Sequence, residues 1–590
     1  MKEFLKNALA SCLGITIALI FFTFFIVIFF IAVFASFSPD STVKIRKDTV
    51  LKVELSGVIP ELTNNVQTGS FNFSERDKLG YRDMITAINN AAEDDNISAI
   101  KLSLEWPSLN VTAVNELMNS LKSASDNGKP IFVHGTNFSQ SSYYLASVAD
   151  HISLNRFGSV DFRGFGMMAA FLPEFFSKMG VEFYTYSAGD YKGAGENFSR
   201  TNFSDENREQ MEDVLFKTYD LFLARISENR GISEDRLREI ADQFLSRDDN
   251  SALELGLVDA IESKREFEMR IKDAIGVDRD SELRTVSIGD YFRSTRSSSR
   301  SRDSDQIAVI YAEGMIMDGN DQGGIITDQP YVSAITKIAE NDNISAVVLR
   351  VNSGGGSVVA SDNIFRALEK LKETGKPLVV SMGDVAASGG YYISAPADVI
   401  FAEPQTITGS IGVIFMIPNA SELMQEKLAF HFDSIATGPN ALRFLPTHEF
   451  TDFEHQYYEE AVQLVYQRFV QLMADSRNMS YEDVHQVAQG RIWMGEDAMA
   501  AGLVDNIGTL KDAIEMAASL ADIEDYRIRT YPQIKDPFTR LIEELLGESV
   551  SLEQKALERL SQTFGDFTHI QQIHRLQGKQ AIFPYTIMYN

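Results

Sequence analysis

The chain contains the same sequence pattern twice, and this duplication limits what its 590 residues can fold into. Four short motifs recur in the same order at an offset of about 247 residues, the separation of Asn96 and Asn343. They are Asn-Ile-Ser-Ala (from 96 and 343), Gly-Lys-Pro (128 and 375), Tyr-Tyr followed by Ala-Asp (143 and 391) and Gly-Leu-Val-Asp (256 and 502). Solenoid units are about 20 to 50 residues long, so this period indicates a duplicated domain. Where the copies differ, one site can be divided between them.

Two large α/β units with additions at both ends are the organisation that the repeat predicts. Residues 51–60 and 307–316 are expected to be equivalent opening strands, and β-rich apolar runs alternate with helical patterns in each copy. This alternation is typical of βαβ units and a largely parallel sheet. The predicted segments are an N-terminal tip and transmembrane anchor (1–40), a first repeat (48–292), a Ser/Arg-rich linker (293–305), a second repeat (306–525) and a helical tail (526–590).

A membrane anchor is predicted near the N-terminus. Residues 12–35 are uncharged and almost entirely apolar, and about 20 apolar residues span a bilayer as a helix. A cleaved signal peptide has a shorter apolar region of roughly 7 to 15 residues, although Val33-Phe34-Ala35 offers a weak cleavage site. Lys2 and Lys6 favour a cytoplasmic N-terminus, whereas three positive residues just after the run oppose it. We expect the N-terminus inside and the repeats on the exported side.

The net charge excludes some classes of partner, and the cysteine count excludes a disulfide within one chain. The net charge of −29 argues against nucleic-acid binding, because the basic footprint of such proteins is missing. The same charge repels anionic lipid headgroups, so any membrane attachment must be hydrophobic. Cys12 is the only cysteine, which rules out a disulfide within one chain.

A glycine-rich loop in the second copy is the first candidate for chemistry. Residues 352–357 (Asn-Ser-Gly-Gly-Gly-Ser) follow a predicted buried strand and precede a helix. Consecutive glycines let backbone N–H groups face a site without interference from Cβ atoms. A phosphate cradle is one interpretation, but the Lys-Ser/Thr ending of a P-loop is missing. An oxyanion hole is the better interpretation, and a plain tight turn remains the alternative.

Ser410 is the candidate nucleophile. It lies between glycines in Thr-Gly-Ser-Ile-Gly (408–412), although it departs from the G-x-S-x-G elbow at its first position. A serine between glycines is common in loops, and the comparison of the copies decides in its favour. The first copy has Phe162 or Arg163 opposite Ser410, and Leu-Glu-Trp-Pro-Ser (104–108) replaces the glycine loop. The first copy therefore lacks both candidate elements.

A serine nucleophile needs a base, and the eight histidines offer none that stands out by its context. A lysine base is the alternative. The pKa of an unperturbed lysine is about 10.4. Lowering this pKa toward neutral pH costs roughly 4 kcal/mol of stabilisation of the charged form, and burial in an apolar pocket can produce a shift of that size. Lys192 has small neighbours in Tyr-Lys-Gly-Ala-Gly-Glu (191–196) that permit close approach, but composition alone does not rank it above the other lysines.

These motifs resemble, over essentially the whole chain, the long duplicated form of the bacterial signal peptide peptidase A (protease IV) family. The resemblance rests on the glycine loop at 352–357, Ala-Ala-Ser-Gly-Gly-Tyr at 386–391, Thr-Gly-Ser-Ile-Gly at 408–412 and Tyr-Lys at 191–192. It implies tandem Clp/crotonase-like (ββα spiral) domains, an α/β class, with an N-terminal transmembrane helix. The family usually has proline at the position of Gly354, and this departure puts the rigidity of the loop in doubt.

The resemblance also implies a site and a biological setting. Ser410 is then the nucleophile and Lys192 the general base, and the oxyanion is held by the N–H groups of Gly355, Gly356 and Ile411. The sequence leaves open which hydroxyl orients the lysine, and Ser434 and Thr437 are the candidates because they lie in a plausible segment. No cofactor or metal ion is implied. The expected protein is a bowl-shaped homotetramer in the bacterial inner membrane, with its catalytic domains on the periplasmic side, that degrades signal peptides and other short apolar peptides.

Two other functions remain open from the sequence. The same fold class includes acyl-CoA enzymes, which also use glycine-loop oxyanion holes. The chain could also be a catalytically silent membrane scaffold whose second copy keeps ancestral loops. Failure to bind coenzyme A would exclude the first alternative, and labelling by a serine-reactive fluorophosphonate probe would exclude both.

Overall fold

The computed structural model describes residues 43–63, 79–295, 305–320, 324–532 and 579–582, together with five single positions between 14 and 25. The predicted anchor at 12–35 lies outside the described residues except for these five positions. Most of the predicted linker and tail also lies outside them. In the part of the chain that is described, no helix is both long and apolar enough to cross a membrane.

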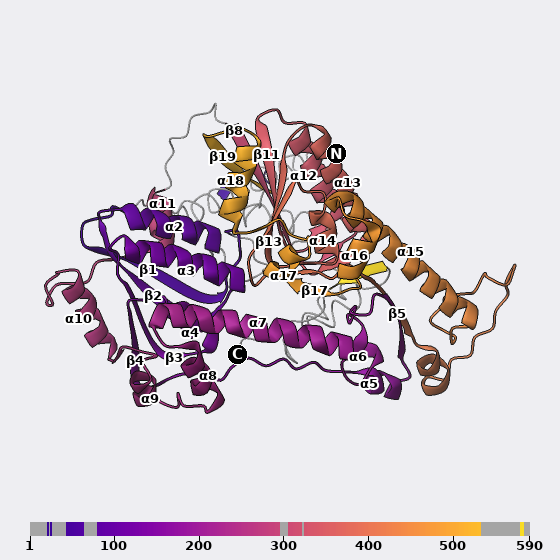
Figure 1. Cartoon of the computed structure of the whole chain (residues 1–590), viewed down its shortest axis with the longest axis horizontal. Helices are drawn as coiled ribbons and strands as arrows, with labels where there is room; N and C mark the ends of the chain where they lie inside the picture. Colours follow the sequence, from indigo (N-terminus) through magenta and orange to yellow (C-terminus); the bar gives the residue numbers. More distant parts are fainter. Residues whose placement is uncertain are drawn as a thin grey trace, which may run out of the picture.

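The first copy is built on a six-stranded parallel sheet with the order β6-β4-β3-β2-β1-β7 (Figure 1). Helices α2, α3 and α4 connect its first four strands, and their apolar side chains form one core with the sheet. The strands are β1 (Thr49–Val58), β2 (Ile97–Ser108), β3 (Ile131–Phe138), β4 (His151–Val160), β6 (Ala260–Ile261) and β7 (Thr285–Ser287), and the helices are α2 (Tyr81–Glu93), α3 (Val111–Asp126) and α4 (Gln140–Ala146).

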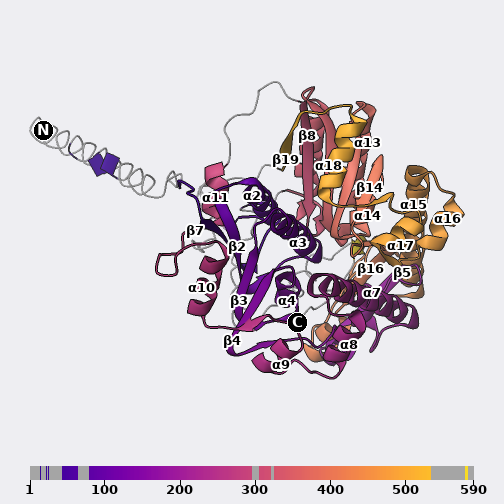
Figure 2. The same cartoon turned by 60° about the vertical axis from the view of Figure 1, so that its left-hand side comes forward.

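The second copy repeats this plan in an eight-stranded sheet with the path β17-β15-β13-β11-β8-β19, to which β14 and β18 add (Figure 2). All pairs are parallel except β15 with β17. The strands are β8 (Asp305–Glu313), β11 (Ile344–Ser353), β13 (Leu378–Ala387), β14 (Val399–Ala402), β15 (Ile407–Gly409), β17 (Ile492–Met494), β18 (Asn506–Ile507) and β19 (Tyr526–Tyr531), and the connecting helices are α12 (Asp328–Ala339), α13 (Val358–Glu373) and α14 (Gly389–Ser394). The predicted α/β class and opening strands β1 and β8 are confirmed.

Two predicted boundaries differ from the structure. Residues 526–531, assigned to a helical tail, form β19 and pair with β8, because Tyr-Arg-Ile-Arg-Thr-Tyr is rich in strand-forming residues. The predicted linker begins inside helix α11 (Ile288–Thr295), which covers the end of the first sheet. The second repeat is therefore longer than predicted at its end.

The motifs that recur in sequence make the same hydrogen bonds in both copies. The buried hydroxyl groups of Tyr143 and Tyr391 donate to the carbonyl oxygens of Leu257 and Leu503, each at 2.9 Å. The carboxylates of the paired Ala-Asp motifs likewise accept from the first backbone N–H of β3 and of β13. The duplication in sequence is thus a duplication of structure.

A third sheet joins the two copies. Strand β5 (Glu182–Ala188) leaves the first copy and pairs antiparallel with β16 (Val413–Asn419) of the second. The sheet order is β10-β9-β12-β20-β16-β5, so strand β20 (Lys579–Ile582) lies between β16 and the short strand β12 (Gly355–Ser357). Strands β9 (Ile316–Met317) and β10 (Ile326–Thr327) complete the sheet.

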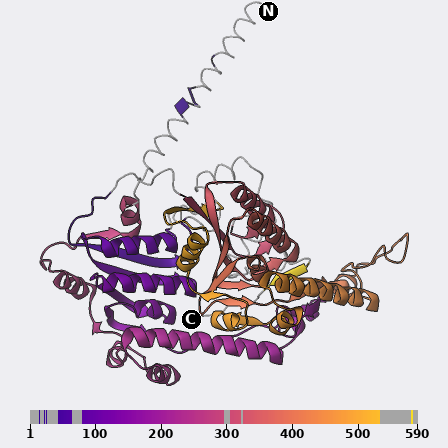
Figure 3. The same cartoon turned by 45° about the horizontal axis from the view of Figure 1, so that its top comes forward.

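Helix α7 (Asp205–Arg230) also joins the copies, running beneath both of them (Figures 1 and 3). Phe222 and Ile226, near its end, are buried in the core of the first copy. Met211 and Val214, near its start, pack against Ile407 and other residues of the second copy. One helix therefore fixes the relative position of the two units.

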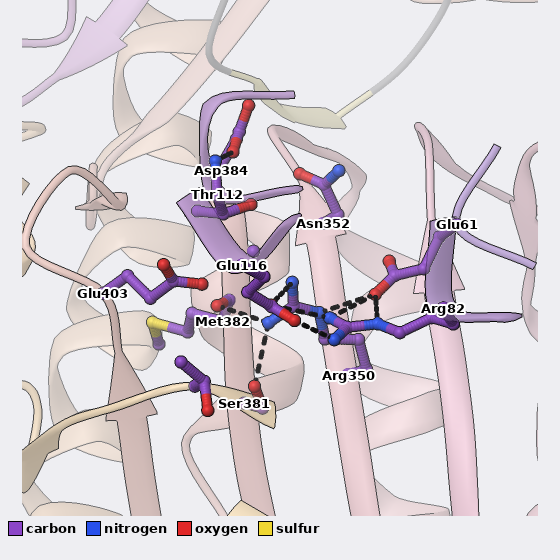
Figure 4. A network of polar contacts seen from close by, with 12 residues as sticks. Glu61, Arg82, Thr112, Glu116, Arg350, Asn352, Ser381, Met382, Asp384 and Glu403 are labelled. Atoms are coloured by element: carbon purple, nitrogen blue, oxygen red, sulfur yellow. Dashed lines mark hydrogen bonds and ion pairs between the residues drawn. The ribbon is translucent and has the colours of Figure 1, made fainter. Parts of the chain in front are cut away.

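A buried charge network lies between the two copies (Figure 4). Arg350 of β11 is only 1% exposed, and its Nε donates to Glu61 of the first copy at 3.0 Å. Arg82 pairs with Glu61 at 2.9 Å and also with Glu116. Burial alone would raise the pKa of Glu61, but Arg350 and Arg82 outweigh it and lower the pKa. Removing one partner of such a pair typically costs about 3–5 kcal/mol, so the network constrains how the copies meet.

Asp384 adds a second buried link between the copies. Its carboxylate accepts from the backbone N–H groups of Val111 and Thr112 at 2.8 and 2.7 Å, and so caps helix α3 of the other copy (Figure 4). Free N–H groups at a helix N-terminus favour an acidic partner. This contact ties the end of β13, which leads into the candidate site, to the first copy.

Candidate active site

Lys192 enters the site from the loop that follows β5, with its side chain buried in the second copy. The backbone N–H of Tyr191 donates to Gln489 O at 2.9 Å, and Gln210 of α7 donates to Tyr191 O at 2.8 Å. Arg491 lies over the Tyr191 ring, 4.9 Å from its centroid. These contacts from two elements hold the loop on the second copy, where Lys192 is 5% exposed.

Ser410 lies directly after β15, at the corner where the chain turns toward β16. Its φ of +51° is in the left-handed region, which costs a non-glycine residue free energy and is common at functional sites. Its backbone N–H donates to Arg491 O at 2.7 Å, which holds the corner in place. The side chain is 3% exposed.

Three oxygen atoms surround the amine of Lys192. Nζ lies 3.0 Å from Ser410 Oγ, 2.9 Å from Ser410 O and 2.8 Å from Ser388 Oγ. A neutral amine has two N–H donors and one lone pair, and this set of partners matches it when the lone pair accepts from the Ser410 hydroxyl. The two N–H groups then donate to Ser410 O and Ser388 Oγ. The structure thus brings the two predicted site residues into direct contact.

Burial lowers the pKa of Lys192 from its ordinary value to about 7. An ammonium group in a dry site loses its hydration, and desolvation therefore favours the neutral amine. Among the described residues, the amine of Lys192 bonds to Ser388 and Ser410, and no carboxylate forms an ion pair with it that would restore the charge. The lysine can therefore be neutral near physiological pH.

Ser388 is a site residue to which the sequence assigned no role. It caps helix α14 with φ of +56°, and its N–H donates to Gly409 O at 2.8 Å, next to Ser410. It is fully buried. The Ala-Ala-Ser-Gly-Gly-Tyr motif was the available signal, but only the folded chain shows that its hydroxyl faces Lys192.

Gly490 permits the close approach of the Lys192 loop. A Cβ atom added to Gly490 would lie 2.6 Å from Lys192 Cβ, closer than real Cβ contacts allow, and its φ of +75° also favours glycine. The requirement for glycine therefore comes from the contact between the two copies.

The predicted oxyanion donors lie around the same site, but their N–H groups differ from one another in their hydrogen-bond partners. Among the described residues, none accepts from the N–H of Ile411, the residue after Ser410. Gly355 N–H donates to Ser353 Oγ at 3.1 Å, and Gly356 pairs with Ile316 of β9. Both glycines approach Gly389, the neighbour of Ser388, closely enough that a Cβ there would lie 3.1 Å from Gly355 Cα.

The predicted lysine-orienting hydroxyls do not reach the lysine. Ser434 and Thr437 are exposed on the segment that follows β16, and neither contacts Lys192 in the structure. The hydroxyl that bonds to Nζ, apart from Ser410, belongs to Ser388. The expectation for Ser434 and Thr437 is therefore wrong for the single chain, because this segment extends away from the second copy (Figure 1).

The corresponding corner of the first copy has other side chains in place of a site. Phe162 is fully buried, with its ring edge-to-face on Tyr143 at 6.0 Å. Gln140 Oε1 accepts from the N–H groups of Arg163 and Gly164 at 2.9 and 2.8 Å. The N–H groups of the first copy that correspond to those of Ile411 and Gly412 are thus bonded to a side chain.

Comparison with known proteins places the chain in a family. The sequence matches the model of Peptidase family S49 twice, over residues 123–278 and 370–524. It is 34% identical over 487 residues to Protease 4 of Salmonella typhi, which covers 81% of this chain and 78% of that protein. It is 31% identical over 516 residues to Serine protease SPPA, chloroplastic, of Arabidopsis thaliana, covering 85% and 74%. A third relative, Putative signal peptide peptidase SppA of Enterococcus faecium, is 35% identical over 223 residues, covering 38% and 64%. The chain therefore belongs to peptidase family S49, with the family domain present twice.

Proposed function

We propose that this protein is a serine endopeptidase in which Ser410 is the nucleophile and Lys192 the general base. The observation that carries the proposal is the buried contact of 3.0 Å between Lys192 Nζ and Ser410 Oγ. Membership of peptidase family S49 supports the same reaction class. A base must be within hydrogen-bond reach and partly unprotonated at the working pH, and a lysine pKa of about 7 meets the second condition.

The reaction then follows from the residues around the dyad. Neutral Lys192 takes the hydroxyl proton as Ser410 Oγ attacks the carbonyl carbon of a peptide bond. The C–N bond breaks, the leaving amine takes the proton from Lys192, and an ester to Ser410 remains. Water attacks this ester, Lys192 takes its proton, and the proton returns to Oγ as the carboxylate product leaves. Ser388 keeps Nζ aimed at Oγ throughout.

The developing oxyanion needs N–H donors at the site. We assign the first to Ile411, whose N–H no described residue accepts. The second comes from the glycine loop, where Gly355 N–H would exchange Ser353 Oγ for the substrate. Gly356, paired with β9, holds the loop in place.

An extended peptide fits the surroundings of the dyad. Strand β20 pairs antiparallel with β12 on one side and β16 on the other, and its partners on β16 run from Phe415 to Ile414, toward Ser410. A substrate strand in the position of β20 would pair with both β12 and β16 and would pass Ser410. Relatives named as signal peptide peptidases support short apolar peptides, released signal peptides above all, as the substrate class.

The setting of the enzyme is also part of the proposal. Residues 12–35 anchor the chain in a bacterial inner membrane with the repeats on the periplasmic side, and the repeats have the Clp/crotonase-like spiral fold. Four chains form a closed assembly whose recessed sites exclude folded proteins. The apolar run at 12–35 supports the anchor and the parallel sheets of both copies support the fold, whereas the four-chain assembly rests on the family resemblance alone.

A comparison of two substrates tests the proposal. The purified protein is incubated with a synthetic signal peptide and with a folded globular protein, and fragments are measured by mass spectrometry. We expect cleavage within the apolar peptide and very slow cleavage of the folded protein. Equal rates on both, or no cleavage of the signal peptide, would contradict the proposed substrate class.

A further inference from the structure

The face of helix α7 that meets the second copy contains a buried amide, the side chain of Gln210. Asn207, Gln210, Met211 and Val214 are buried and recur at the spacing of one helix face. Met211 and Val214 pack among apolar side chains of the second copy. Gln210 is only 3% exposed. A buried amide beside apolar groups costs free energy unless its donors and its acceptor are bonded.

The amide of Gln210 bonds to backbone groups of both copies. Its Nε2 donates to Tyr191 O at 2.8 Å and to Asn207 Oδ1 at 2.9 Å. Its Oε1 accepts from the N–H of Ile492 at 3.1 Å. Among the described strands, β17, which contains Ile492, pairs only with β15. A glutamine amide can donate and accept as a peptide group does, so Gln210 takes the place of a further strand beside β17.

The two backbone groups that Gln210 joins lie next to the two members of the dyad. Tyr191 O is the carbonyl oxygen of the peptide bond to Lys192. Ile492 directly follows Arg491, whose carbonyl oxygen accepts from the N–H of Ser410 at 2.7 Å. One side chain therefore bridges the loop that carries the base and the strand that holds the turn of the nucleophile.

The second copy has a helix like α7 but no glutamine at this position. Helix α15 (Asp452–Arg477) has 26 residues, as α7 has, and the N-cap residues Ser204 and Thr451 correspond at an offset of 247. This offset places Tyr457, which is 51% exposed, opposite Gln210. The buried amide is therefore a feature of the copy that supplies the lysine, and not of this helix in the repeat.

From these contacts we infer that Gln210 is a positioning residue, which holds Lys192 opposite Ser410 without touching the reacting atoms. The inference rests on the proposed function, because Gln210 acts through the Ser–Lys pair. A lysine side chain is long and flexible, so the place of Nζ depends on how the backbone of its loop is held. Without the bridge the loop keeps the bond from Tyr191 N–H to Gln489 O, so the fold survives while the loop can shift. A shift of about 1 Å can reduce the rate by roughly 100-fold.

Two substitutions of Gln210 test the inference. Gln210→Met keeps the length of the side chain and removes its hydrogen bonds, and Gln210→Asn keeps the amide but is too short to bridge both partners. Each should lower kcat for a short apolar peptide by about 10- to 100-fold with little change in KM. The pH midpoint of kcat should move upward, because a displaced Lys192 regains hydration and its ammonium form is favoured.

The measurements are rates per folded molecule from pH 5 to 10. The rate at which a fluorophosphonate probe labels Ser410 gives the same profile without a substrate. Thr218→Val is the matched control, because Thr218 is also buried on α7 and its hydroxyl donates to Val214 O at 2.7 Å within the helix. The control should lose some thermal stability and keep both kcat and the pH midpoint.

The outcomes separate this inference from the proposed function. An upward shift of the pH midpoint in the Gln210 variants, with a normal midpoint in Thr218→Val, would support it. An unchanged midpoint in both Gln210 variants would overturn it, and so would failure of both to fold, because Gln210 would then serve only the fold. Lys192→Ala is measured beside them. If Lys192→Ala stays active, the proposed function is wrong, whereas an inactive Lys192→Ala beside normal Gln210 variants refutes the inference alone.

Discussion

Lys192 and Ser410 are 218 residues apart and belong to different copies of the repeat, yet Lys192 Nζ lies 3.0 Å from Ser410 Oγ. Neither copy holds both residues, so a single copy has no equivalent of this pair. The joint made by β5, β16 and α7 therefore serves the site as well as the fold. Divergence after duplication has left one composite site in place of two.

The pH dependence of hydrolysis should follow the protonation state of Lys192. Burial lowers the pKa of Lys192 to about 7, and only the neutral amine accepts the proton of Ser410. Activity should therefore be low below this pKa, rise tenfold per pH unit through the acid range and level off above it. Rates of peptide hydrolysis from pH 5 to 9 measure this. A profile with its midpoint near the ordinary lysine value, or one abolished by replacing a histidine, would contradict the assignment.

Ser388 is expected to position the lysine. Hydrogen bonds to a charged group contribute about 1.5–3 kcal/mol, so Ser388→Ala and Ser388→Gly should each lower kcat by about 10- to 100-fold with little change in KM. Loss of this acceptor also removes stabilisation of the ammonium form, and the pH midpoint should fall. Glycine tolerates φ of +56° and alanine does not, so the glycine variant should be the more stable. If both variants had the same pH midpoint as the unmodified protein, Ser388 would have only a structural role.

Gly490→Ala should disable the site while leaving most of the fold intact. The added Cβ would lie 2.6 Å from Lys192 Cβ, so the lysine loop must move and the Nζ–Oγ contact is lost. A displacement of about 1 Å can reduce the rate by roughly 100-fold. The matched control is Gly289→Ala, where the nearest atom is the end of Arg293 at 3.7 Å. Equal activity of the two variants would show that the close approach is not required.

Truncation before β20 should activate the enzyme. Residues 579–582 pair with β12 and β16 in the position proposed for the substrate strand. Because they belong to the same chain, they compete with peptides at a high effective concentration. Deleting residues 579–590 should raise kcat/KM for a short peptide by on the order of tenfold, mainly through KM. Steady-state kinetics and a thermal melt of both forms measure this. An unchanged or lower kcat/KM in a truncated chain of normal thermal stability would contradict the proposal that substrate binds between β12 and β16.

The sequence predicted the parts of this structure that its repeats and local motifs encode. Matching motifs identified the two α/β units because they specify matching hydrogen bonds, such as those of Tyr143 and Tyr391. Comparison of the copies also singled out Ser410. Lys192 could not be ranked among the lysines from its neighbours, because its burial depends on β5 pairing with β16, a contact between segments more than 200 residues apart.

The residues that sequence analysis missed or misplaced have the same physical explanation. Ser388 belongs to a motif that was recognised, but its role depends on the turn that aims its hydroxyl at Nζ. Ser434 and Thr437 lie on the exposed segment that follows β16 and extends away from the second copy (Figure 1). Short-range pattern identifies strands and helices, whereas pairings between copies are set by the packed structure.

The most direct test of the central claim is covalent labelling of the nucleophile. The full-length protein, Ser410→Ala and Lys192→Ala are treated with a fluorophosphonate probe at pH 8, and the modified residue is identified by mass spectrometry. The account predicts one adduct on Ser410 in the unmodified protein, none in Ser410→Ala and labelling slowed by at least about 1000-fold in Lys192→Ala. The double variant should hydrolyse peptides no more slowly than either single variant, because the two residues act as a unit. Labelling at another residue, or equal labelling of Ser410 in Lys192→Ala, would contradict the account.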